Sequence, residues 1–183
     1  MAPADSPKRS YILSGTYRAL RVEKHELGPL ELAIVGFVGS KQAPRSYAEV
    51  HELIFEYYKI NEPEKISGFI DRTIGTLERL QTNFTPEVYT NNPQLTGRVQ
   101  KLLGHYAELK VKDVDNVTYT DFCPDDLGKV RGNSLYPFRE HSNRVIRKLT
   151  DANILESSKE SRGRGGMDHF LKLNPALVIE RPT

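Results

Sequence analysis

The stretch HSNRVIRKLTDANIL at residues 141–155, with ESSKESRGRGGMDHFLKL after it at residues 156–173, gives the strongest indication of the fold of this chain. In the first part, apolar and basic side chains project to opposite sides when successive residues are placed at about 100°. The apolar positions are Val145, Ile146, Leu149 and Ala152, and the basic positions are Arg144, Arg147 and Lys148. The pattern predicts a helix that packs on a core through one side and presents cations on the other.

The second part of this stretch predicts a β-hairpin with a basic, glycine-rich tip. The tip is formed by Arg162, Gly163, Arg164, Gly165 and Gly166. Glycine permits positive φ and a tight turn, and its small size lets the backbone and the arginines approach a groove closely. The sequence FLKL on the return side alternates like a strand packed on one face. Helix, strand, basic loop and strand in this order predict a winged helix.

A helix of this kind beside a basic wing is suited to double-stranded DNA. The apolar stripe fixes the helix to a rigid body, while guanidinium and ammonium groups reach phosphates or guanine edges. Asn143 adds a predicted contact to adenine. We predict that the helix enters the major groove and the wing enters the minor groove, with DNA contacts from Arg139, Asn143, Arg144, Arg147, Lys148, Arg162, Gly163 and Arg164.

The same segment also carries a family resemblance. Residues 144–173, in particular SRGRGG with the preceding RKLTDANIL, resemble the C-terminal winged helix of archaeal origin-recognition initiator proteins, whose wing tip carries a similar Ser-Arg-Gly-Arg run. The resemblance implies major-groove contacts from the recognition helix and minor-groove contacts from Arg162 and Arg164. The chain departs from the family because it has no G-x-x-x-x-G-K-[ST] loop and hence no ATPase domain of that kind. The resemblance therefore implies a plasmid- or virus-type initiator, or a transcription factor with the same wing.

Composition and charge describe a polar globular protein. The 183 residues are 38% hydrophobic and 27% charged, with a formal net charge of only +2. Residues 129–183 nevertheless hold eleven Lys and Arg against six Asp and Glu, a net +5, which leaves about −3 on the preceding 128 residues. The positive charge is concentrated at the C-terminal end, where the DNA contacts are predicted.

The sequence also predicts where the protein resides. Apolar runs fall short of the roughly 20 residues that cross a bilayer, and residues 1–9 lack the apolar stretch of a signal peptide. Cys123 is the only cysteine, so an internal disulfide or a cysteine-rich zinc site cannot form. We expect a cytoplasmic, nucleoid-associated protein with no membrane partner.

Local patterns place several helices before the basic segment. Pro29 and the apolar run LELAIVGFVG predict a buried first helix. Ser46 and Glu49 have the S-x-x-E spacing of a capping box, which predicts that a second helix starts at Ser46. Helical apolar stripes follow at residues 66–81 and from Pro93 to about Leu109.

Between and after these helices the sequence predicts less regular structure. Residues 83–92 contain one proline and three asparagines and are interpreted as a connector. Residues 110–122 alternate imperfectly and are expected to contribute one short strand. Pro124, Asp125 and Asp126 are expected to start a short helix.

Together these elements predict a mainly helical α+β fold of tandem helix-turn-helix or winged-helix units with small β-wings. We expect a disordered arm at residues 1–10 and an N-terminal helical or winged-helix unit at residues 11–90, serving dimerisation. Residues 91–183 are expected to form the C-terminal winged-helix unit that binds DNA. A homodimer would place two recognition helices on half-sites about 34 Å apart.

The sequence contains no motif that predicts an enzyme. It lacks H-E-x-x-H, G-x-S-x-G, a dinucleotide-binding glycine run and a phosphate loop. The acids around Cys123, at positions 121, 125 and 126, have no neighbouring histidine and are interpreted as a helix N-terminus. The dispersed histidines His51, His105, His141 and His169 are interpreted as surface or half-buried side chains. We predict no catalytic residue, no metal and no cofactor.

Three alternatives remain open at the level of sequence. A replication initiator and a transcriptional regulator need the same DNA-binding apparatus. A winged helix can instead be a protein-interaction module whose basic face meets an acidic partner. The RGRGG run can also bind RNA or single-stranded DNA, although the chain has no tryptophan and no aromatic-rich strand motif for base stacking.

Overall fold

The computed structural model describes residues 21–22, 25–91, 93–123, 129–130, 133–134, 137–161, 163 and 167–175. Contacts within the chain divide it into two compact units. Unit 1 joins Met1–Ile54 to Asn143–Thr183, and unit 2 is the continuous segment Phe55–Ser142. This division differs from the expected boundary between residues 90 and 91, because both ends of the chain contribute to unit 1. The expected arm at residues 1–10 lies outside the described residues.

Unit 1 consists of helices, a three-stranded sheet and a short two-stranded ribbon. Helices α2 and α7 each have one part in this unit and one part in unit 2. The elements of unit 1 are β1 (Arg21–Val22), β2 (His25–Glu26), α1 (Pro29–Gly39), β3 (Arg45–Ser46), α2 (Tyr47–Asn61), α7 (Pro137–Asp151), β6 (Leu155–Ser161) and β7 (Met167–Leu173).

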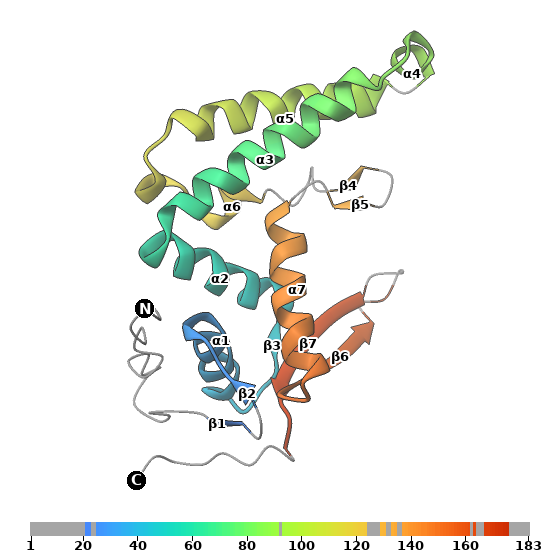
Figure 1. The fold of residues 1–183 in the computed structure, drawn as a ribbon. Coiled ribbons are helices and arrows are strands. Elements are labelled where there is room, and N and C mark those ends of the chain that lie inside the picture. Colours follow the sequence, from blue (N-terminus) through green and yellow to red (C-terminus); the bar gives the residue numbers. More distant parts are fainter. Residues whose placement is uncertain are drawn as a thin grey trace. The chain divides into compact units, whose positions relative to one another are not determined.

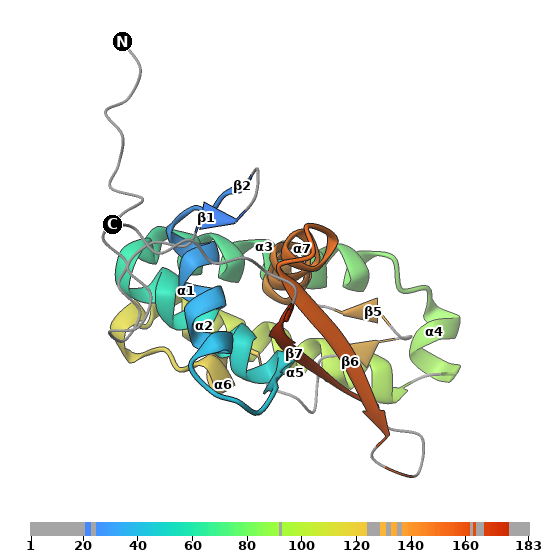
Figure 2. The same cartoon turned by 90° about the horizontal axis from the view of Figure 1, so that it is seen from below.

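The three-stranded sheet of unit 1 is antiparallel with the order β3-β7-β6. Its central strand β7 forms the return arm of a long hairpin with β6, and Figure 2 shows these two strands as neighbouring arrows. On its other edge, β7 pairs with β3 in the register Arg45↔Leu171 and Ser46↔Phe170. The two-residue strand β3 therefore links the N-terminal segment of unit 1 to the C-terminal hairpin through backbone pairing.

The core of unit 1 is aliphatic and lies under the sheet and the helices. Helix α1 buries residues on most sides, as its apolar run predicts, and Ile34 and Val35 are fully buried. Val50 of α2, Ile146 of α7 and Leu171 of β7 are buried as well. Leu171 on the central strand belongs to the C-terminal hairpin. The core of unit 1 therefore contains residues from both the N-terminal and the C-terminal segment of the chain.

The predicted start of α2 is confirmed by a capping box. The backbone N–H of Ser46 donates to Glu49 Oε2 at 2.8 Å, and the backbone N–H of Glu49 donates to Ser46 Oγ at 3.2 Å. Each side chain satisfies an amide at the helix start that has no partner within the helix. The cap fixes the first turn of α2 directly after β3.

Unit 2 is built around a pair of long helices. Helices α3 (Pro63–Thr82) and α5 (Pro93–Val111) lie side by side and run in opposite directions, with α4 (Pro86–Asn91) at the turn between them (Figure 1). The predicted stripe of α3 is confirmed, since Ile66, Phe69 and Leu77 are buried. The unit also contains η1 (Val114–Asn116), α6 (Tyr119–Phe122) and a ribbon of β4 (Lys129–Val130) with β5 (Asn133–Ser134).

Two expectations for unit 2 are wrong. Residues 83–92 include the short helix α4, and residues 110–122 hold η1 and α6 in place of a strand. The reason is local capping: Asp113 accepts the backbone N–H of Asp115, and Thr118 forms a capping box with Asp121. Side chains that bond to nearby amides in this way favour turns over a ladder. The helix expected from Pro124 lies outside the described residues.

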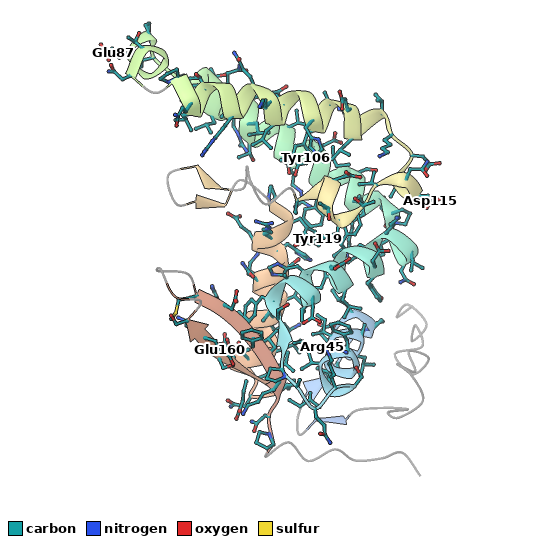
Figure 3. All side chains as sticks on the ribbon, turned by 180° about the vertical axis from the view of Figure 1, so that it is seen from behind. Arg45, Glu87, Tyr106, Asp115, Tyr119 and Glu160 are labelled. Atoms are coloured by element: carbon teal, nitrogen blue, oxygen red, sulfur yellow. The ribbon has the colours of Figure 1, made fainter. Side chains whose placement is uncertain are left out.

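Aromatic rings fill the core of unit 2. Phe138 contacts Phe69 and Phe122 edge to face, with centroids 5.3 and 5.2 Å apart, and Phe122 also contacts Phe55 at 5.2 Å. Tyr106 of α5, which Figure 3 labels, donates its hydroxyl to the carbonyl of Phe122 in α6. Such ring pairs add to the free energy gained by burial.

The fold is therefore mainly helical α+β with a small antiparallel sheet. Within the described residues, none of the helices combines the length and apolar character that a membrane span requires.

Candidate nucleic-acid interface

Helix α7 presents the cationic side that the sequence predicts. It begins at Pro137, a residue whose missing N–H suits the first turn of a helix. Ile146 and Leu149 are buried, whereas Arg144, Arg147 and Lys148 are exposed. The predicted amphipathic helix is confirmed, and its basic residues in unit 1 point away from the aliphatic core.

Side chains on the solvent-facing side of α7 form two rows. Asn143, Arg147 and Thr150 follow the spacing i, i+4, i+7 and line a cleft in unit 1. Lys148 lies in the neighbouring row, with its Nζ atom 3.4 Å from Glu31 Oε1 of α1. Its side chain is still 74% exposed, so this ion pair leaves Lys148 accessible to a ligand.

The hairpin of β6 and β7 is paired along its whole described length, from Leu155↔Leu173 to Ser161↔Met167. Gly163 in the tip has φ +72°, a left-handed conformation that suits glycine, and its N–H donates to Ser161 Oγ at 3.3 Å. Glu160, labelled in Figure 3, marks the outer end of β6. The other predicted tip residues, Arg162, Arg164, Gly165 and Gly166, lie outside the described residues.

A cleft of about 820 Å³ lies between the start of α2, the exposed side of α7 and the inner part of the hairpin. The described residues that line it all belong to unit 1. Arg147 and Lys159 supply positive charge, His51 and His169 supply imidazole rings, and Asp168 is the acid among the lining residues. A cleft with more cations than acids suits an anionic ligand.

Hydrogen bonds and ring contacts connect the three walls of this cleft. His51 Nε2 of α2 lies 2.9 Å from Asn143 Oδ1 of α7. The Tyr47 hydroxyl lies 2.9 Å from Ser157 Oγ of β6, and the Tyr47 ring packs on His169 of β7 with centroids 5.3 Å apart. The walls are thus held by side-chain contacts as well as by the backbone.

Carboxylates near the cleft are held by their own partners. The backbone N–H of Ser46 is the main cause of a lowered pKa for Glu49, which therefore stays ionised at neutral pH. Arg45 balances this charge, with its Nη1 atom 3.4 Å from Glu49 Oε1 and its guanidinium over the Phe37 ring at 4.1 Å. In Figure 3, Arg45 marks the strand β3 from which these contacts start.

The structure places five of the predicted DNA contacts on one helix, α7. Asn143, Arg144, Arg147 and Lys148 share the unit 1 part of α7. Arg139 belongs to unit 2, is half-buried, and donates from Nη2 to the carbonyl oxygen of Cys123 at 3.3 Å.

Several residues of the cleft were not predicted from the sequence as site residues. Tyr47, His51, Lys159 and His169 line it, and two of them come from α2, far from the hairpin in sequence. The capping box at Ser46 locates the helix start but says nothing about which strand lies beside it. The pairing of β3 with β7 is what brings them to the site.

Comparisons with known proteins give no guide to this site. No family model, curated protein or solved structure matches the chain. In the part of the chain that the structure describes, no group of three or more His, Cys, Asp and Glu is placed to hold a metal ion. The function is therefore inferred from the geometry of unit 1.

Proposed function

We propose that unit 1 is a single winged helix interrupted by unit 2, and that it binds double-stranded DNA. The observation that carries this proposal is the pairing of β3 with β7, which gives the sheet order β3-β7-β6 around α1, α2 and α7. In this arrangement α7 is the recognition helix and the β6–β7 hairpin is the wing. Our proposal replaces two winged helices in tandem with one that is assembled from both ends of the chain.

The exposed cations fit this mode of binding. The major groove, about 12 Å wide, admits an α-helix, so α7 can place Arg144 and Arg147 against phosphates or base edges. Lys159 of β6 and the Arg-Gly tip then reach the neighbouring backbone or the minor groove. The resemblance of residues 144–173 to an initiator winged helix agrees with these roles.

The same apparatus serves a replication initiator or a transcriptional regulator, and we propose one of these roles for the protein. We also propose a nucleoid location and a homodimer that reads two half-sites. Sites about 34 Å apart, one turn of the double helix, suit such a dimer. A repeated DNA site near a replication origin would favour the initiator, and one near a promoter would favour the regulator.

The proposal is tested by fluorescence anisotropy with a random-sequence duplex from about 50 to 200 mM salt. Neutralisation of about five phosphates predicts a slope of log K against log salt near −4 to −5. The double variant Arg162→Ala, Arg164→Ala is expected to make this slope less steep by about 2. The matched control is Arg79→Ala with Arg98→Ala, two exposed arginines of unit 2, which leaves the slope unchanged.

Other outcomes would point elsewhere. If the wild-type protein binds no duplex even at 50 mM salt, the DNA proposal fails and a protein-interaction module becomes the better explanation. Tighter binding of a single strand of equal length than of the duplex would favour the single-strand or RNA function. A slope that the control variant also changes would place the contacts outside unit 1.

A further inference from the structure

Asn143 differs from the other α7 residues in the cleft because its polar group is held in place. Thr150 donates its hydroxyl to the carbonyl oxygen of Arg147 at 2.9 Å, which occupies that donor within the helix. Arg147 is an exposed, flexible cation suited to a phosphate. Asn143 is also exposed, yet its amide oxygen is bonded to His51 at 2.9 Å. One end of this amide is therefore anchored while its side chain remains accessible.

The anchor is itself well fixed. His51 is only 8% exposed, and its ring meets the Tyr47 ring edge to face at 6.3 Å. Because an amide oxygen can only accept, His51 Nε2 carries the proton and donates it to Asn143 Oδ1. The bond links α2 to α7, so the orientation of the amide is set before any ligand arrives.

We infer that Asn143 is the specificity-determining residue of this interface and that His51 is its positioning residue. The inference rests on the proposed DNA binding of unit 1. A carbonyl oxygen has two lone pairs, so Oδ1 can accept from His51 and from a base at the same time. Together with the NH₂ group, this oxygen matches the N6 donor and N7 acceptor of adenine in the major groove. Because His51 already orients the Asn143 amide, this side chain loses less conformational entropy when it pairs with adenine.

The test is a selection of binding sites from a randomised duplex library, followed by sequencing. Sites selected by the wild-type protein are expected to carry adenine at one position for each half-site. Asn143→Ala is expected to lose about 5- to 150-fold of the preference at that position alone. Its salt slope on random DNA is expected to stay unchanged, because a neutral amide releases no counterions.

His51 variants separate positioning from general stability. His51→Ala is expected to weaken preference at the same position by less than Asn143→Ala does, with the other positions unchanged. His51→Gln is expected to restore the preference, because its amide N–H can replace the imidazole donor. Glu52→Ala, an exposed neighbour on α2, is the matched control and leaves every position unchanged.

The outcomes distinguish this inference from the proposed function. If wild type binds duplex DNA with a steep salt slope but Asn143→Ala alters no position, the inference is wrong and the DNA proposal stands. If Asn143→Ala alters one position and neither His51 variant does, the positioning role of His51 is wrong. If wild type binds no duplex at all, both fail together. Should His51→Ala unfold, His51→Phe takes its place, because it keeps a ring but has no donor for Asn143 Oδ1; an unchanged preference in that variant means that the positioning role is wrong.

Discussion

The two units of this molecule reach a packed core by different routes. Unit 2 is continuous in sequence and packs aromatic rings, such as Phe69 and Phe138, between neighbouring helices. Unit 1 packs aliphatic side chains. Its sheet is complete only when β3 pairs with β7, two strands that lie more than a hundred residues apart in the sequence. The comparison shows that local patterns suffice for the two long helices of unit 2, α3 and α5, whereas the fold of unit 1 depends on one distant strand pair.

Both units pair some of their cations with carboxylates. In unit 2, Lys65, Lys110 and Lys112 each lie within 4 Å of a carboxylate, and Arg72 and Arg79 bond back to carbonyls of their own helix. In unit 1, Arg45, Lys148 and Lys172 form ion pairs, whereas Arg144, Arg147 and Lys159 form none with any residue that the structure describes. These three cations lie on α7 and β6, which favours these two elements as the surface that meets an anionic partner.

The largest expected effect tests the aromatic core of unit 2. Phe69 is 2% exposed and contacts both Phe138 and His141 with centroids 5.3 Å away. Phe69→Ala is expected to lower the free energy of unfolding by about 3–5 kcal/mol, through lost burial and the cavity left behind. Urea denaturation measures this change in the free energy of unfolding. Ile60→Ala, at a side chain that is 76% exposed, is the control and should shift stability by about 0.5 kcal/mol or less.

A somewhat smaller effect tests the closure of unit 1. Leu171 on the central strand is fully buried, and Leu171→Ala is expected to cost about 2–5 kcal/mol. Hydrogen exchange should show faster exchange at β3, β6 and β7 than at α3 and α5. Lys172→Ala, at the exposed neighbouring position, should leave this pattern intact. Equal acceleration in both units by Leu171→Ala would mean that the units do not unfold separately.

Much of the fold could be predicted because its signals are local. The apolar run of α1, the Ser46 cap, the stripe of α3 and the two-sided pattern of α7 each act within a few turns of helix. The two-residue strand β3 is too short to show alternation, and nothing near Arg45 identifies its partner. Local sequence patterns therefore could not predict that α1 and the start of α2 belong to the same unit as the hairpin.

The candidate site divides in the same way. Asn143, Arg144, Arg147 and Lys148 were predicted because helical spacing places them opposite an apolar stripe. Tyr47 and His51 lie in the cleft only because β3 pairs with β7, a contact that no local pattern encodes. Arg139 lies one turn before Asn143 on the same helix, in the part of α7 that belongs to unit 2.

Each unit contains a capping box, and these give a matched pair of smaller effects. Ser46→Ala is expected to lower the free energy of unfolding by about 1 kcal/mol, because it frees an amide at the start of a 15-residue helix. Thr118→Ala is expected to cost less, because α6 has only 4 residues to lose. Chemical denaturation of both variants measures the difference. A larger loss from Thr118→Ala would show that α6 contributes more to unit 2 than its length suggests.

The smallest expected effect is the pH dependence of these two caps. The pKa of Glu49 is lowered mainly by the Ser46 backbone N–H, and that of Asp121 mainly by the Thr118 side chain. A carboxyl whose folded pKa is lowered stabilises the fold above its unfolded value and loses that contribution as pH falls through the folded value. The loss begins near pH 4.5 for Glu49 and near pH 3.8 for Asp121, their ordinary values.

Glu49→Gln and Asp121→Asn test these two windows. Both side chains are about 40% exposed, at 41% and 39%, so solvent screens their interactions. Each variant should lose only about a few tenths of a kcal/mol at pH 7. The difference from wild type should shrink below pH 4.5 for Glu49→Gln and only at lower pH for Asp121→Asn, in denaturation series at several pH values. A difference that stays constant with pH would show that the caps act through shape and not through charge.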